Sequence, residues 1–78
     1  MEPHEIEFKK IEEDKRSYKI GFFKKGSDNL HGIGRHVFTN GSIYEGMWKD
    51  DELNGYARWL QMHGDSYTGC WLDGKKHG

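Results

Sequence analysis

A repeat of 23 residues constrains the fold of this 78-residue chain more than any other feature. When residues 32–54 are laid over residues 55–77 without a gap, seven positions are identical, where chance would give about one or two. The identical pairs are Gly32 and Gly55, Arg35 and Arg58, Gly41 and Gly64, Tyr44 and Tyr67, Gly46 and Gly69, Trp48 and Trp71, and Asp50 and Asp73. A short chain with such a repeat is expected to stack copies of one small structural unit.

Each repeat has the pattern of a β-hairpin. Residues 35–39 and 43–48 are rich in strand-forming side chains, and Asn40-Gly41 separates the two runs. Asn-Gly in that position favours a type I′ turn, because both residues tolerate a positive φ. The sequence therefore predicts an all-β fold, an open single-layer antiparallel meander of hairpins with about five or six strands.

The N-terminal part follows the pattern less closely. We divide the chain into a charged segment over residues 1–16, a degenerate half repeat over 17–31, and full repeats over 32–54 and 55–78. Within the first segment, Ile6 and Phe8 alternate with charged residues, which favours a strand. A short helix over residues 5–15 is the alternative, but the apolar residues there do not follow a 3.6-residue period.

The length of the hairpin loop decides which side chains share a face of the sheet. A loop with an even number of residues would place Val37 opposite Tyr44 and Ile33 opposite Trp48. In that register, Gly46 and Gly69 leave room for aromatic rings to lie on the sheet. The predicted face carries Ile33, Arg35, Val37, Tyr44, Gly46 and Trp48, and, in the next repeat, Tyr56, Arg58, Leu60, Tyr67, Gly69 and Trp71. The two arginines would either stack on these rings or be solvated.

The pattern Tyr-x-Gly-x-Trp, completed by Gly-x-Gly, resembles the MORN repeat (membrane occupation and recognition nexus). It occurs at residues 44–48 and 67–71, and Gly32-Ile33-Gly34 supplies the second element. The chain departs from the pattern at two positions. After the first Tyr-x-Gly-x-Trp motif, Asp51 stands at the position that Gly74 holds after the second motif. In the second repeat, Ala57 stands at the position that Gly34 holds in Gly32-Ile33-Gly34. The resemblance implies an elongated, twisted sheet of hairpins that acts as a scaffold or appendage. Both lipid binding and protein–protein contact are associated with such arrays.

Composition and charge exclude several classes of protein. The net charge of −1 gives no bulk attraction to nucleic acid, and no run of about 18 apolar residues could form a transmembrane segment. The N-terminus has no apolar region typical of a secretory signal, and the single Cys70 cannot form an internal disulfide. We expect an intracellular, cytoplasmic protein that can associate with the cytoskeleton or a membrane.

No residue pattern indicates catalysis, a cofactor or a metal. Gly32-Ile33-Gly34 begins like a dinucleotide-binding motif, but Val37 stands where the third glycine would be. Cys70 has no activating base near it in the sequence. The five histidines lack the spacing of metal ligands; they are His4, His31, His36, His63 and His77. We therefore expect a protein that is not an enzyme and that needs neither cofactor nor metal.

An aromatic surface is the predicted binding site. A single-layer sheet cannot bury both of its faces, so exposed rings would form an apolar patch for a protein partner or a second copy. The candidate residues are Tyr44, Trp48, Tyr56, Tyr67 and Trp71. Residue Gly78 stands where another repeat would begin, so the last strand is expected to continue into a longer array or to dock on a partner.

Lysines next to the strands suggest phospholipid binding as the alternative. If the hairpins stack in register, Lys24, Lys25, Lys75 and Lys76 would lie along one edge and could contact an anionic membrane. The acidic residues 50–52 lie between them and would oppose that contact. In this alternative the chain would be a membrane-targeting or regulatory segment of a larger enzyme, such as a phosphatidylinositol phosphate kinase.

Overall fold

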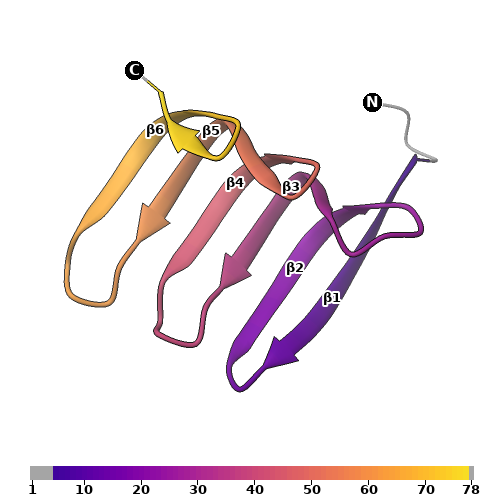
Figure 1. The fold of residues 1–78 in the computed structure, drawn as a ribbon, viewed down its shortest axis with the longest axis horizontal. Helices are drawn as coiled ribbons and strands as arrows, with labels where there is room; N and C mark the ends of the chain where they lie inside the picture. The colour runs from indigo at the N-terminus through magenta and orange to yellow at the C-terminus, as the bar shows by residue number, and fades with distance from the viewer. Residues whose placement is uncertain (1–4, 78) are drawn as a thin grey trace.

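Strands follow one another in chain order across a single antiparallel sheet (Figure 1). The computed structural model describes residues 5–77. The strands are β1 (Ile6–Asp14), β2 (Ser17–Lys24), β3 (Leu30–Val37), β4 (Ile43–Lys49), β5 (Glu52–Leu60), β6 (Ser66–Leu72) and β7 (Lys75–Lys76). The described part measures 38 × 33 × 13 Å, so it is one sheet thick. The predicted all-β meander is confirmed, and so is the strand over residues 5–15, while the short β7 is an addition.

The hairpin loop between β3 and β4 differs from the predicted type I′ turn. Phe38 and Ser42 close the loop, since the Phe38 N–H donates to the Ser42 carbonyl at 2.9 Å. The Gly41 N–H donates to the Phe38 carbonyl, also at 2.9 Å. Gly41 has a positive φ of 92°, whereas Asn40 does not have a positive φ. The loop therefore has three residues and a glycine in the left-handed region, a known alternative to the two-residue turn.

This odd-length loop changes the register of the sheet. Val37 lies opposite Ile43 and Arg35 lies opposite Glu45. The predicted pairing of Val37 with Tyr44 is therefore wrong by one residue. Because side chains alternate along a strand, a shift of one residue moves the whole side-chain set of β4 to the other face relative to β3.

One side of the sheet, which we call the tryptophan face, holds the core. Trp48 and Trp71 are only 7% and 6% exposed. The indole N–H of Trp48 donates to the carbonyl of Gly34 at 2.9 Å, and that of Trp71 donates to the carbonyl of Ala57 at 3.2 Å. In both repeats the acceptor lies 14 residues upstream. The core of this face consists of Phe23, Leu30, Trp48, Leu53, Ala57 and Trp71, with Ile11, Tyr44, Trp59 and Tyr67 packed against it.

The two strand glycines of the repeat have different roles. A Cβ atom at Gly69 would lie 2.9 Å from the hydroxyl of Tyr67, so this glycine leaves room for a ring, as predicted. At Gly46, where φ is 147°, a Cβ atom would instead overlap the Cβ atom of Ala57 on the neighbouring strand. Gly46 therefore permits the close approach of β4 and β5.

The loops that link successive hairpins lie at one end of the strands, and the hairpin turns lie at the other end (Figure 1). Asp51 and Gly74 occupy equivalent positions there and both have a positive φ, 71° and 79°. The Asp51 carboxylate accepts hydrogen bonds from the Leu30 N–H and from Lys19 Nζ, each at 3.1 Å. The departure from the repeat pattern at Asp51 thus keeps the backbone conformation, which Asp tolerates, and adds an ion pair to the buried Lys19.

Candidate interaction surface

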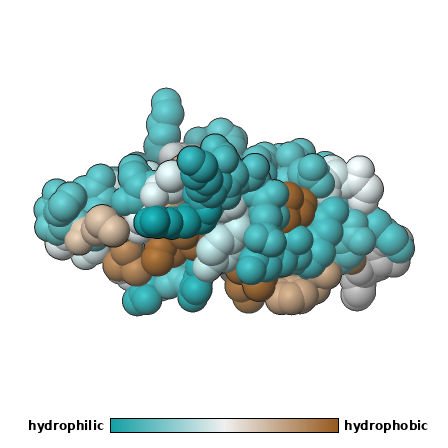
Figure 2. Space-filling model, turned by 90° about the horizontal axis from the view of Figure 1, so that it is seen from below, coloured by the Kyte–Doolittle hydropathy of each residue, from teal (hydrophilic) through white to brown (hydrophobic). Residues whose placement is uncertain are grey.

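The other side of the sheet, which we call the groove face, exposes large apolar side chains. Phe8 is 64% exposed, Ile33 is 63% exposed and Tyr56 is 65% exposed. Seen edge-on, the thin sheet carries hydrophobic surface along its lower side (Figure 2). An exposed apolar surface of this kind is typical of a binding site.

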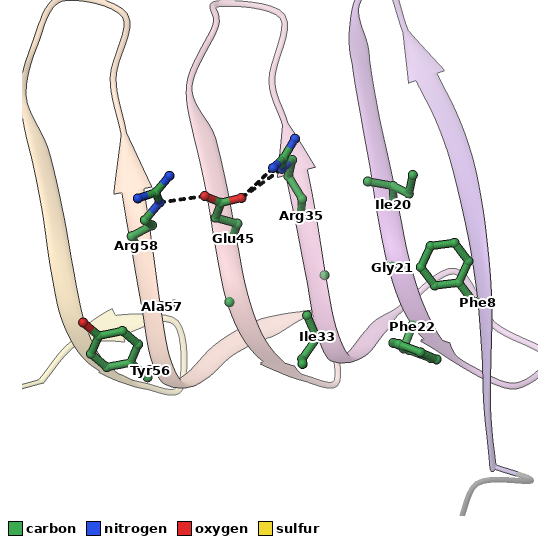
Figure 3. Close-up of a pocket in the computed structure, with 12 residues that line it drawn as sticks. Phe8, Ile20, Gly21, Phe22, Ile33, Arg35, Glu45, Tyr56, Ala57 and Arg58 are labelled. Carbon is green, nitrogen blue, oxygen red and sulfur yellow. Dashed lines mark hydrogen bonds and ion pairs between the residues drawn. The ribbon is translucent and has the colours of Figure 1, made fainter.

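These side chains border a shallow groove of about 550 Å³ (Figure 3). Phe8 and Phe22 close one end, with ring centroids 5.3 Å apart in an edge-to-face arrangement. Ile20 lies on the same strand as Phe22, Ile33 lies on the next strand, and Tyr56 lies at the other end. Because the side chains come from β1, β2, β3 and β5, the groove runs across the strands.

A charged triad of Arg35, Glu45 and Arg58 lies beside the apolar side chains of the groove. Arg35 contacts Glu45 Oε2 through Nε and Nη2, both at 2.9 Å, and Arg58 Nε donates to Glu45 Oε1 at 2.6 Å. Burial raises the pKa of Glu45, but hydrogen bonds and charges of Arg58 and Arg35 outweigh it, and the pKa is lowered overall. The carboxylate therefore stays ionised and holds both guanidinium groups in place.

The structure separates the five predicted partner-binding residues. Tyr56 lies on the groove face, whereas Tyr44, Trp48, Tyr67 and Trp71 lie on the tryptophan face. The prediction that the tryptophans form an exposed stripe is wrong, because both are buried in the core. The role of these five residues in binding a partner stays a prediction.

Of the two alternatives for the arginines, stacking on the tryptophan rings is not found. Arg35 and Arg58 lie on the groove face, on the opposite side of the sheet from the rings of Trp48 and Trp71. Both form ion pairs with Glu45 instead of being solvated alone. The absence of stacking has the same cause as the error in register, the odd length of the hairpin loop.

Sequence reasoning missed Phe8, Phe22 and Glu45 as residues of this surface, whereas Ile33 was placed on a shared face with Tyr56 but also with residues of the opposite side. Phe8 and Phe22 precede the clear repeats, so no 23-residue periodicity points to them. Ile33 and Glu45 have other neighbours in the observed register than in the predicted one. For Ile33 and Glu45, the signal that could have given the correct neighbours is Gly41 at the end of a three-residue loop, which fixes the register of β3 and β4.

The four predicted lipid-contacting lysines do not form one cluster. Lys24 Nζ lies 2.9 Å from Asp50 Oδ1, and this hydrogen bond and charge raise the pKa of Lys24 and lower that of Asp50. Lys76 Nζ lies over the rings of Trp59 and Tyr67, 4.7 and 5.2 Å from their centroids. Lys25 and Lys75 are exposed. Strands β3 to β6 separate the first pair of lysines from the second.

Other candidate chemistry is sparse in residues 5–77. That part of the chain contains no group of three or more His, Cys, Asp or Glu side chains that could hold a metal ion. Cys70 is free and exposed, opposite Tyr56. His4 and Gly78 lie outside the described residues. Over the same residues, no helix is long and apolar enough to cross a membrane.

The fold and surface define an open, single-sheet protein of repeated β-hairpins. The MORN repeat family model matches residues 27–43, 44–59 and 67–78, together more than half of the chain. The chain therefore belongs to the MORN repeat family, whose repeats form modules for membrane or protein interactions. A comparison with curated proteins finds no match.

Proposed function

We propose that this chain is a non-catalytic interaction module that binds a segment of a protein partner on its groove face. The observation that carries the proposal is the exposure of Phe8, Ile33 and Tyr56 along one groove. The tryptophan face already supplies the core of the fold. The exposed row therefore contributes little to folding and is free to be covered by a partner.

The composition of the groove suits a protein segment. Tyr and Arg are enriched at protein interfaces, and Tyr56, Arg35 and Arg58 all line this groove. Four steps separate β1 from β5, and at about 4.8 Å per step the groove spans about 19 Å. That is roughly the length of a 12-residue helix, which rises about 1.5 Å per residue. A short amphipathic segment is thus the occupant of matching size.

Two other occupants are less well supported. A second copy bound groove to groove would bring two triads together, each with two positive charges and one negative, and these would repel each other. A phospholipid surface needs a cluster of free basic side chains. Of the predicted lysines, Lys24 is paired with Asp50 and Lys76 lies against aromatic rings.

Peptide selection followed by methyl NMR tests the proposal. The probe is a displayed library of random 12-residue peptides, selected against the intact 78-residue chain. We expect selected peptides to shift the methyl signals of Ile20 and Ile33, which line the groove. The methyl signals of Leu30 and Leu53, on the tryptophan face, are the internal control and should stay in place. Failure to enrich any peptide, or shifts confined to the two leucines, would contradict the proposal.

A further inference from the structure

We propose that the partner segment presents a carboxylate, from Asp or Glu, to Arg58 in the groove. This inference rests on the proposed function and names the chemistry that the groove recognises. It comes from the charged triad, in which one carboxylate serves two arginines. The partner's acid would supply the second carboxylate.

Arg58 is positioned in advance for such a contact. Its Nε donates to Glu45 Oε1, while Arg35 holds the other oxygen of the same carboxylate. Within residues 5–77, the terminal nitrogens of Arg58 make no hydrogen bond, and its side chain is 53% exposed. A guanidinium group fixed through Nε can offer its terminal N–H groups to a second carboxylate.

The repeat itself shows where an acid is missing. Arg58 is the repeat equivalent of Arg35, and Thr68 is the equivalent of Glu45. In the sheet, Arg58 lies between Glu45 on β4 and Thr68 on β6. The neutral hydroxyl of Thr68 cannot balance the charge of Arg58. The triad is therefore left with two positive charges and one negative.

The surroundings of the triad favour an acid that belongs to an apolar segment. Tyr56 and Ile33 lie along the same groove as the two arginines (Figure 3). Covering these side chains would exclude water from the contact between Arg58 and the bound carboxylate. Removing water strengthens a charge-assisted hydrogen bond and makes it selective for acids over bases.

The test supplies the missing acid from within the chain. In the Thr68→Glu variant the new carboxylate lies opposite Arg58 and competes with the peptide. We expect the peptides selected on the wild-type chain to bind this variant about tenfold more weakly in isothermal titration. Thr68→Val keeps the branched shape without a charge and should leave affinity unchanged. Arg58→Gln, and a peptide with its acid replaced by the corresponding amide, should each lose a similar factor.

The outcomes separate this inference from the proposed function. Peptides that shift the Ile20 and Ile33 methyl signals but bind Thr68→Glu as tightly as Thr68→Val would overturn the inference and leave the proposed function standing. Enrichment of basic peptides would do the same. If no peptide binds in the groove, both proposals fail. Binding of phosphatidylserine vesicles that is lost in Arg58→Gln, without any peptide binding, would overturn both in favour of a lipid.

Discussion

The indole N–H of Trp48 donates a hydrogen bond to the carbonyl oxygen of Gly34 at 2.9 Å. The indole of Trp71 makes the equivalent bond to Ala57. Each tryptophan thereby crosses from its own strand onto the preceding one and joins two strands of a hairpin on a single face. A thin sheet gains a core on that side, and its other side keeps apolar residues at the surface.

Close contact between β4 and β5 depends on Gly46. We expect Gly46→Ala to destabilise the chain by about 2 kcal/mol or more, because the added methyl group overlaps Ala57 and the backbone has a positive φ. Urea unfolding measures the change. Gly64→Ala is the matched control, since Gly64 also has a positive φ but a Cβ atom added there would have no neighbour within 4 Å. Its cost should be limited to about 1 kcal/mol of backbone strain. Equal losses in the two variants would contradict the steric explanation.

The ion pair between Asp51 and Lys19 ties a linking loop to β2. Replacement of Asp51 by Asn keeps a residue that tolerates the left-handed conformation but removes the charge opposite the buried Lys19. We expect a loss of about 1–3 kcal/mol in the free energy of unfolding, because a buried ammonium group loses its closest carboxylate. Asp50→Asn, which removes an exposed partner of Lys24, should leave the unfolding midpoint nearly unchanged. A larger loss of stability in Asp50→Asn than in Asp51→Asn would contradict the role assigned to the ion pair between Asp51 and Lys19.

The charged triad makes the stability of the folded chain depend on pH. The pKa of Glu45 in the folded chain lies below its ordinary value of 4.5. The stabilisation that ionised Glu45 contributes is therefore complete when the pH is above 4.5, and it is lost as the pH falls through the lower pKa of the folded chain. Urea unfolding between about pH 7 and pH 3 should show stability falling in acid, and less steeply in Glu45→Gln. Burial raises the pKa of Glu13, but His36 and Lys19 outweigh it and lower this pKa too, so some acid dependence should remain. An unchanged slope in Glu45→Gln would contradict the role of the triad.

The sequence was sufficient to predict the architecture but not the register. Glycine, tyrosine and tryptophan recur every 23 residues, and this period requires similar hairpins side by side. Asn40-Gly41, however, is compatible with loops of two or three residues, and only the three-residue loop is formed. A difference of one residue exchanges the faces of a strand, and the even-loop register therefore groups Tyr56 with tryptophans that lie on the other side.

The groove was harder to predict for a second reason. Phe8 and Phe22 line one groove with Ile33 and Tyr56 only because the five strands β1 to β5 lie side by side in chain order, and the first two residues lie outside the clear repeats. The contact between Arg35, Glu45 and Arg58 likewise depends on which residues face one another across β3, β4 and β5. Composition and local propensity carry no information on such pairings.

The tryptophan face should hold the fold, while the groove face remains available for a partner. Parallel urea unfolding of Trp48→Phe and Tyr56→Ala compares the two faces. Trp48→Phe should lose about 1.5–3 kcal/mol, because it removes buried volume and the bond to Gly34. Tyr56→Ala removes more atoms but should change stability by about 0.5 kcal/mol or less, because the side chain is exposed. If Tyr56→Ala costs as much as Trp48→Phe, the groove face is part of the core and is not a free binding surface.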